Sequence, residues 1–315
     1  MDYLHHHPDF DSLIRLLEGE TGIQAGLIEK DYWIMQVLYG LQQQGYEFEL
    51  KGGTSLSKGF GIIDRFSEDI DIHIHPPEEH GINENPKNNN QANIDARKQF
   101  YDQLAKEIKI DGILESNRDH AFDDTRQYRS GGVRLNYKSL FPSVQGVKEG
   151  ILLEVGFDVV TPNLPQTISS WAYDRAIPSE IEIKDNRAKD VRCYDPRYTF
   201  VEKLQTIATK FRREQETRDE DQNFMRQYYD AAQLLKEDKI IEFIGTDEYQ
   251  KHKQKRFSKL DLAIPISQNE AYLLNDPALR KRFKDRYQNT RNLYYRGQPD
   301  FEEVLASIHK YIDGL

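Results

Sequence analysis

Two short stretches of alternating apolar and polar residues flank a glycine-rich turn in the first quarter of the chain. Tyr46, Phe48 and Leu50 alternate with glutamates, and Ile70 to Ile74 alternate with Asp and His. A period of two is typical of a half-buried strand, so both stretches are predicted to be strands. Between them, residues 52–55 (Gly-Gly-Thr-Ser) predict a tight turn that leads into a short helix.

Longer segments show the spacing of amphipathic helices. Residues 9–44 form one predicted helical segment, and Phe100, Leu104 and Ile108 share one face of a second helix. A helical pattern returns near Thr199 and fills most of the remaining chain. Between the second strand and the second helix, residues 76–93 are rich in Pro, Gly and Asn and predict a long surface loop.

Further strands are predicted around residues 113–115, 132–137 and 150–160. The pattern indicates an α/β (α+β) core with a mixed sheet, followed by a mostly α-helical domain. The predicted division is a helical segment that packs on the core (1–45), the α/β domain (46–185) and the helical domain (186–315).

Composition restricts the functions open to the chain. The 315 residues carry 43 Lys+Arg and 53 Asp+Glu, a formal net charge of −10. This balance argues against a protein that coats nucleic acids without sequence preference. The single cysteine, Cys193, excludes an internal disulfide and a multi-cysteine zinc site, and we expect it to be structural. No stretch resembles a signal peptide or a membrane span, so we expect a cytoplasmic protein without a membrane partner.

Candidate chemistry is concentrated around the glycine-rich turn. Asp69 and Asp71 lie two apart on a predicted strand, so both side chains leave the same face. Paired carboxylates repel each other unless a cation lies between them, and Mg²⁺ prefers oxygen ligands and substrate phosphates. Gly52 and Gly53 allow a phosphate to approach the backbone closely. Without the aspartates, the Gly-Gly-Thr-Ser sequence is equally compatible with a plain turn.

A third carboxylate is expected from a neighbouring strand. In residues 151–160 (ILLEVGFDVV), Glu154 and Asp158 share one face, and apolar residues occupy the other. Glu154 is the first choice and Asp158 the alternative, with the role of binding metal and helping to deprotonate an acceptor hydroxyl. A carboxylate that merely faces solvent is the competing interpretation.

Together these segments resemble the nucleotidyltransferases of the AbiEii/AbiGii toxin family, within the polymerase-β-like superfamily. The resemblance rests on GGTSLSK followed by DRFSEDIDI, and it is supported by residues 29–33, 195–204 and 226–230. It covers about residues 27–235. One departure is the interval between Gly53 and Asp69, which is longer than the general superfamily spacing, so we expect an enlarged turn.

The resemblance implies roles for individual residues. Those expected to hold the triphosphate of an NTP are Gly52, Gly53, Thr54, Ser55 and Lys203; those expected to bind Mg²⁺ are Asp69, Asp71 and Glu154. Asp230 matches a later essential aspartate of the family. Arg65 and Ser67 would hold the Asp69 and Asp71 carboxylates in place without binding the metal themselves. A surface lysine and a solvated aspartate are the alternatives for Lys203 and Asp230. His73 and His75 continue the Asp69/Asp71 face and are interpreted as ordinary cleft or surface histidines.

A basic stretch near the C-terminus suggests where a macromolecule docks. Residues 251–296 contain twelve Lys/Arg and four Asp/Glu, a local net charge of +8 that leaves −18 for the rest of the chain. Phe257, Phe283, Tyr287, Tyr294 and Tyr295 are interleaved with these cations. A solvated helix surface with core aromatics is one interpretation of this stretch. The alternative is a docking face for an RNA such as tRNA, which the family resemblance favours.

The combined pattern predicts a Mg²⁺-dependent nucleotidyltransferase that moves NMP from an NTP to an RNA or protein hydroxyl. The resemblance further implies the toxin of a type IV toxin–antitoxin or abortive-infection (phage-defence) system, with a cognate antitoxin. The alternatives are a catalytically silent NTP-binding or interaction protein on the same fold, and a glycosyltransferase that uses a D-x-D motif.

Overall fold

The structure is a computed structural model that describes residues 1–85, 87–179 and 181–315. The chain forms two compact units. The first comprises Met1–Phe60 and Phe66–Tyr194, and the second comprises Gly61–Arg65 and Asp195–Leu315. The first unit extends beyond the expected boundary at residue 185, because the strand Ala188–Tyr194 pairs with the sheet.

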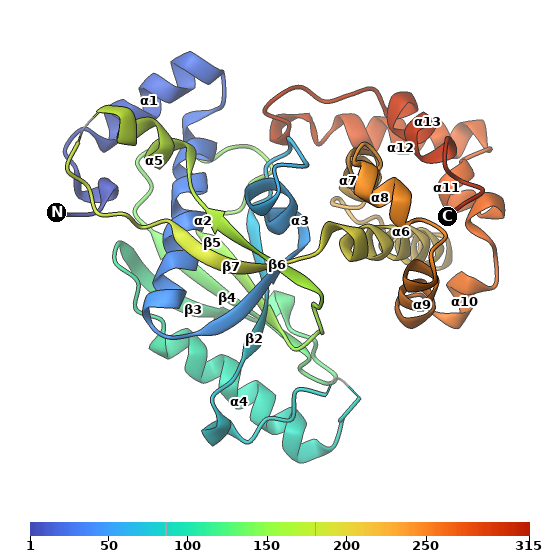
Figure 1. Cartoon of the computed structure of the whole chain (residues 1–315), viewed down its shortest axis with the longest axis horizontal. Helices are drawn as coiled ribbons and strands as arrows, with labels where there is room; N and C mark the ends of the chain where they lie inside the picture. Colours follow the sequence, from blue (N-terminus) through green and yellow to red (C-terminus); the bar gives the residue numbers. More distant parts are fainter. Residues whose placement is uncertain (86, 180) are drawn as a thin grey trace. The chain divides into compact units, whose positions relative to one another are not determined.

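A seven-stranded mixed sheet forms the centre of the first unit (Figure 1). Its order is β3-β4-β5-β2-β1-β7-β6. The strands are β1 (Glu47–Lys51), β2 (Asp69–His75), β3 (Ile113–Asp119), β4 (Ser130–Tyr137), β5 (Ile151–Gly156), β6 (Asn163–Ile168) and β7 (Ala188–Tyr194). The expected α/β core with a mixed sheet is confirmed.

Strand β2 occupies the middle of the sheet, antiparallel to β1 and parallel to β5. Its isoleucines Ile70, Ile72 and Ile74 have no exposed surface. Because successive side chains of a strand alternate between faces, the Asp and His residues of β2 all lie on the opposite face. Burial of one face fixes the register of β2 and therefore the place of its carboxylates.

Helices cover the sheet of the first unit. They are α1 (Phe10–Thr21), α2 (Ala25–Gln43), α4 (Gln91–Glu107) and α5 (Trp171–Ala176). The helical segment expected over residues 9–44 is two helices, because Gly22 adopts a left-handed conformation (φ +72°) that ends α1. Helix α2 packs against β5 and β7, and α4 packs against β3 and β4.

Two strands were not expected from the sequence. Strand β6 contains Pro165, which is tolerated because β6 lies at the edge of the sheet. Strand β7 does not show a regular alternation of apolar and polar residues, because Lys189 and Asp190 follow each other and Asp190 has a positive φ. Conversely, β5 ends at Gly156, so the strand expected over residues 150–160 is shorter. The expected loop 76–93 contains a 3₁₀ turn (Glu78–His80) and ends earlier than predicted, because α4 begins at Gln91; its Pro86 lies outside the described residues.

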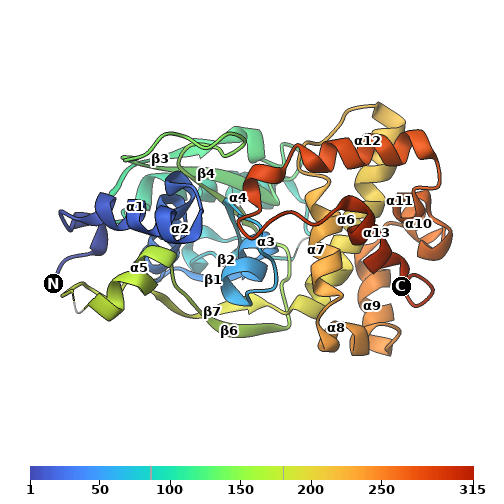
Figure 2. The ribbon, with the colours of Figure 1, turned by 90° about the horizontal axis from the view of Figure 1, so that it is seen from above.

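The second unit is helical, as expected for the C-terminal region. Its helices are α6 (Pro196–Thr217), α7 (Arg226–Leu234), α8 (Asp238–Phe243), α9 (Asp247–Arg256), α10 (Lys259–Leu262), α11 (Glu270–Leu273), α12 (Pro277–Gln288) and α13 (Phe301–His309). The long helix α6 packs against α7 and α9, and α6 and α7 lie side by side in both views (Figure 2). Tyr228, Tyr272 and Phe283 lie fully buried in the core of this unit.

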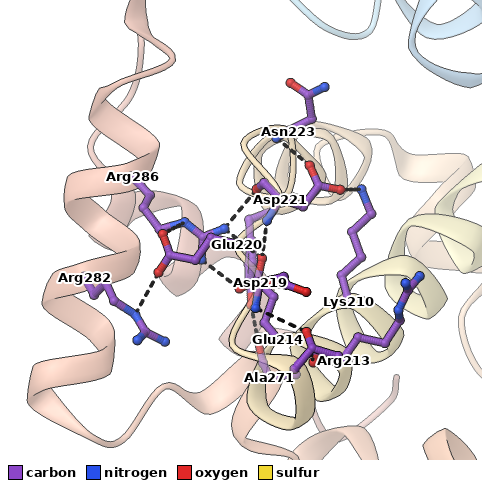
Figure 3. A network of polar contacts seen from close by, with 12 residues as sticks. Lys210, Arg213, Glu214, Asp219, Glu220, Asp221, Asn223, Ala271, Arg282 and Arg286 are labelled. Atoms are coloured by element: carbon purple, nitrogen blue, oxygen red, sulfur yellow. Dashed lines mark hydrogen bonds and ion pairs between the residues drawn. The ribbon is translucent and has the colours of Figure 1, made fainter. Parts of the chain in front are cut away.

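A polar network fixes the connection between α6 and α7 (Figure 3). Arg286 of α12 pairs with both carboxylate oxygens of Glu214 at 2.8 Å and donates to the Asp221 carbonyl. Glu214 in turn accepts the backbone N–H of Asp221, and Lys210 pairs with the Asp221 side chain at 2.5 Å. The Arg286 guanidinium, whose side chain is 12% exposed, thus joins α12 to the connection between α6 and α7.

No helix in the described part of the chain has both the length and the apolar character needed to cross a bilayer.

Candidate functional site

The turn after β1 brings backbone against a carboxylate. Gly52 has φ +73°, a left-handed conformation that L side chains rarely adopt. A Cβ atom at this position would lie 2.2 Å from Asp71 Oδ2. Glycine is therefore required twice at residue 52, once for the backbone conformation and once for the approach of Asp71.

The hydroxyl residues of the turn are buried. Thr54 and Ser55 have no exposed surface, and Gly53 is buried. The Thr54 hydroxyl donates to the backbone carbonyl of Asp69 at 2.5 Å. The turn and the start of β2 are thereby joined, and the role of Thr54 and Ser55 toward a phosphate stays a prediction.

Three carboxylates meet on neighbouring strands. The parallel register of β2 and β5 places Asp71 directly beside Glu154, with Asp69 beside Leu152. Since Asp69 and Asp71 share a face of β2, their side chains lie next to that of Glu154. Asp158 follows the end of β5 and lies 3.8 Å from Lys51 Nζ (Asp158 Oδ2). The geometry therefore groups Glu154, rather than Asp158, with the two aspartates.

Crowding of these carboxylates changes their protonation. Burial, together with the nearby Asp71 and Asp69, raises the pKa of Glu154 to about 8. Burial and the adjacent Glu68 raise the pKa of Asp69 to about 6. The charged forms are disfavoured because they lose hydration and repel one another.

The structure adds three residues that carried no assigned role. Lys148 Nζ lies 3.7 Å from Asp69 Oδ2, and buried Lys30 pairs with Glu68 at 3.4 Å. Glu68 also accepts the backbone N–H of Lys148 at 2.7 Å. Lys30 and Lys148 line a cavity of about 390 Å³. Lys30 lies in one of the segments that carry the family resemblance, so the sequence offered a reason to assign it a role. Lys148 lies in an irregular loop, where no sequence pattern indicated a role.

Arg65, Lys203 and Asp230 form an ion cluster in the second unit. Arg65 Nε and Nη2 bind the two Asp230 oxygens at 2.6 and 2.7 Å, and Lys203 Nζ lies 2.8 Å from Asp230 Oδ2. Lys203 also donates to Gln227. Although burial opposes it, Arg65 and Lys203 hold the pKa of Asp230 below its usual range.

Asp230 has no exposed surface, so its interpretation as a solvated helix residue is wrong; Lys203 is 8% exposed and is not a surface lysine. In this cluster Asp230 positions Arg65 and Lys203. Ser67 is half-buried next to the buried Glu68. Buried Cys193 lies on β7, as expected of a structural cysteine.

The aromatic residues of the basic stretch belong to the core. Phe257, Phe283, Tyr287 and Tyr294 are at most 7% exposed, so the prediction that they stack on RNA bases is wrong. Several cations of the stretch also have acidic partners, among them Arg280 with Glu302, Lys284 with Asp300 and Arg286 with Glu214. Exposed cations include Lys251, Lys255, Lys259, Lys281 and Arg291.

The carboxylate group fits a hard divalent cation. Asp69 Oδ1 is buried and has no hydrogen-bond partner among the described residues. An unsatisfied buried acceptor is costly, and three adjacent carboxylates carry more negative charge than Lys148 offsets. All the atoms that the cluster offers are oxygens, the ligands that Mg²⁺ prefers.

Comparisons with known proteins identify the family of the chain. Residues 36–307 match the family described as "Nucleotidyl transferase AbiEii toxin, Type IV TA system". Among solved structures, an antigenic nucleotidyltransferase-like protein from Paracoccidioides brasiliensis is similar at 15% identity, over 75% of this chain and 91% of that chain. Its TM-score is 0.37, which is too low for this likeness to support a function. No curated protein matches the chain.

A mixed sheet with paired aspartates behind a glycine turn, together with the family match, defines a nucleotidyltransferase. The chain belongs to the AbiEii nucleotidyltransferase toxin family of type IV toxin–antitoxin systems.

Proposed function

We propose that the chain is a Mg²⁺-dependent enzyme that transfers NMP from an NTP to an RNA hydroxyl, with tRNA as the leading acceptor. We further propose that it is a toxin with a cognate antitoxin and that it serves in phage defence. The observation that carries the enzymatic part is the convergence of Asp69, Asp71 and Glu154 beside a turn that only glycine can form.

In this proposal the acceptor oxygen attacks the α-phosphorus, an O–P bond forms, and the bond to the β-phosphate oxygen breaks as pyrophosphate leaves. Asp69, Asp71 and Glu154 would hold Mg²⁺, which supplies charge neutralisation for the triphosphate when bound. Glu154 is the group suited to take the acceptor proton, because its carboxylate lies beside Asp71 in the group that would hold the metal.

The glycine turn suits a triphosphate for a physical reason. Gly52 and Gly53 open a short helical segment, and backbone N–H groups at such a start are directed away from the helix and attract anions. Because the Thr54 and Ser55 side chains are buried, we expect phosphate contacts from the backbone rather than from their hydroxyls. Lys203 stays a candidate phosphate ligand on the strength of the family resemblance.

RNA is favoured as the acceptor by the exposed cations of the C-terminal region. Lys251 and Lys255 lie on α9 and Lys281 lies on α12, all exposed. Since the neighbouring aromatics are buried, recognition would rest on phosphate contacts and shape, and it should weaken steeply with salt. A protein hydroxyl is the competing acceptor and is separated from RNA by the experiment.

The test is a labelling assay with each of the four NTPs, total cellular RNA and total protein, with the products resolved on one gel. We expect label on RNA that requires Mg²⁺ and is lost in Asp71→Asn. Label on protein alone would refute the RNA acceptor and keep the transferase. Absence of both labelling and NTP binding would refute the enzymatic proposal and favour a catalytically silent interaction protein.

A matched pair of variants identifies the third carboxylate. Glu154→Gln should reduce transfer at least a hundredfold, while Asp158→Asn should change it less than threefold, because Asp158 pairs with Lys51. The reverse ranking would assign the role to Asp158.

The toxin role is tested separately. Induced expression should arrest growth, and Asp71→Asn should relieve the arrest without a loss of protein level. Arrest that persists in Asp71→Asn would disconnect toxicity from transfer.

A further inference from the structure

Beyond Asp71, the polar face of β2 continues into a second group of side chains with a different chemistry. Glu49 of β1 pairs across the strands with His73, and His75 lies two residues further along β2. Glu84, from the segment after β2, completes the group. At about 3.3 Å per residue, His73 lies roughly 7 Å from Asp71, so the group is distinct from the carboxylate site.

Glu49, His73 and His75 converge, and Glu84 contacts both histidines. Glu84 Oε2 lies 3.0 Å from both His73 Nε2 and His75 Nδ1, and His75 Nε2 lies 3.0 Å from the Glu49 oxygens. One ligand atom from each of Glu49, His73 and His75 falls within 4.8 Å of the others. Glu84 and Glu49 contact opposite nitrogens of the His75 ring, so only one of them can bind the same metal ion as His75. The set whose ligand atoms lie close together is Glu49, His73 and His75, the mixture of imidazole and carboxylate that zinc accepts.

The orientation of His73 is fixed in the way that metal-binding histidines usually are. Its Nδ1 lies 2.7 Å from the backbone carbonyl of Asp158, which can only accept a hydrogen bond. Nδ1 therefore carries the hydrogen, and the lone pair of a neutral ring lies on Nε2. A carbonyl behind the ring that fixes the tautomer is the common support of a histidine ligand.

Nε2 of His73 is also buried and aimed into the group. The whole residue is only 5% exposed, as is Glu49. With Nδ1 as the donor, Nε2 is an acceptor that faces a carboxylate acceptor, Glu84 Oε2, at 3.0 Å. Two facing acceptors need a cation between them, either a proton or a metal ion.

We propose that Glu49, His73 and His75 form a second metal site, which takes zinc or a similar imidazole-binding divalent ion rather than Mg²⁺. Two imidazoles and one carboxylate suit such ions, whereas Mg²⁺ prefers oxygen ligands alone. Arg192 lies 3.4 Å from Glu49 Oε1 and offsets part of the negative charge. Glu84, from the long connection between β2 and α4, contacts His75 Nδ1 and so orients the ring with Nε2 toward Glu49. The site does not depend on the proposed function.

The test is zinc binding to the full chain after chelator treatment, with Mg²⁺ in excess to occupy the carboxylate site. We expect one zinc per chain, and at least tenfold weaker affinity in His75→Gln and in Glu84→Gln, both of which alter half-exposed residues. Cobalt substitution and X-ray absorption should show two imidazole ligands, and hydrogen exchange of residues 83–85 should slow when zinc is added.

Two controls separate this site from the other candidates in the described chain. His6→Gln disrupts the second histidine group, His5, His6 and Asp111, and Glu154→Gln disrupts the carboxylate site. Both controls should bind zinc as the unaltered chain does. Loss of binding in either control with retention in His75→Gln, or no binding at micromolar zinc, would overturn the proposal.

Discussion

The Glu154→Gln variant measures how much the crowding of Glu154 against Asp69 and Asp71 lowers the free energy of unfolding. Folding raises the pKa of Glu154 from 4.5 to about 8, so the native state binds a proton that the unfolded state releases between these values. Stability must then fall as pH rises through this window, because the native state holds more protons than the unfolded state. Glutamine has nearly the same shape and cannot ionise.

The magnitude follows from the shift. Between pH 5 and pH 9, with chelator present, the unaltered chain should lose as much as about 4 kcal/mol of unfolding free energy relative to the variant, at 1.36 kcal/mol per pKa unit. For a unit of this size, 1 kcal/mol moves Tm by about 2–4 °C, so the Tm difference should change by about 8–16 °C.

The assay is thermal and urea unfolding of both proteins at several pH values, analysed only as the difference between them. The difference cancels every titration that the two proteins share. Addition of Mg²⁺ at pH 8 should stabilise the unaltered chain, by about 2.7 kcal/mol at 100 times Kd, and stabilise the variant less. Parallel pH profiles in chelator would refute the crowding of Glu154 against Asp71 and Asp69.

Three further outcomes test other parts of the structure. Gly52→Ala should abolish transfer and should lower the unfolding free energy by more than Gly45→Ala does. Gly45 has a similar positive φ but open space around its Cβ position, so Gly45→Ala should cost only about 1 kcal/mol in urea unfolding. Equal effects of the two substitutions would show that the approach of Asp71 to residue 52 does not matter. Asp230→Ala should lower the unfolding free energy by about 3–5 kcal/mol, since it leaves two cations buried without their carboxylate; a urea midpoint near that of the unaltered chain would contradict this. Arg286→Met should destabilise by about 3 kcal/mol, whereas Arg282→Met, whose ion pair is half exposed, should change stability by less than about 0.5 kcal/mol.

Local pattern predicted what depends on neighbours in sequence. The alternation along β2 was enough to put Asp69 and Asp71 on one face and the isoleucines in the core. The choice between Glu154 and Asp158 was not predictable, because it depends on the register of β5 against β2 and on where β5 ends. Such a register is set by pairing between segments about 80 residues apart, which no local period encodes.

The dependence on contacts between distant segments also explains why the environments of several residues were predicted wrongly. Tyr287 and Phe283 lie in a sequence crowded with cations, yet their side chains are buried in the helical core while Lys281 and Arg282 of the same helix are exposed. Arg65 was expected to support the carboxylates that follow it, whereas it pairs with Asp230, 165 residues later. The spacing of residues along the sequence does not reveal ion pairs between residues so far apart.

The segment Gly61–Arg65 gives the fold a dependence on the order of synthesis. Its partners come late: the Tyr229 hydroxyl accepts the Asp64 N–H, Asp230 binds Arg65, and the Tyr295 N–H donates to the Asp64 carbonyl. At 5–20 residues per second, a ribosome needs roughly 10–30 s to go from Arg65 to Asp230. A nascent chain therefore carries Asp69, Asp71 and Glu154 well before this segment can make these contacts. A chain whose translation stops before residue 230 contains Asp69, Asp71 and Glu154 but lacks the carboxylate that binds Arg65. The Gly61–Arg65 segment can therefore reach its final contacts only after most of the chain has been synthesised.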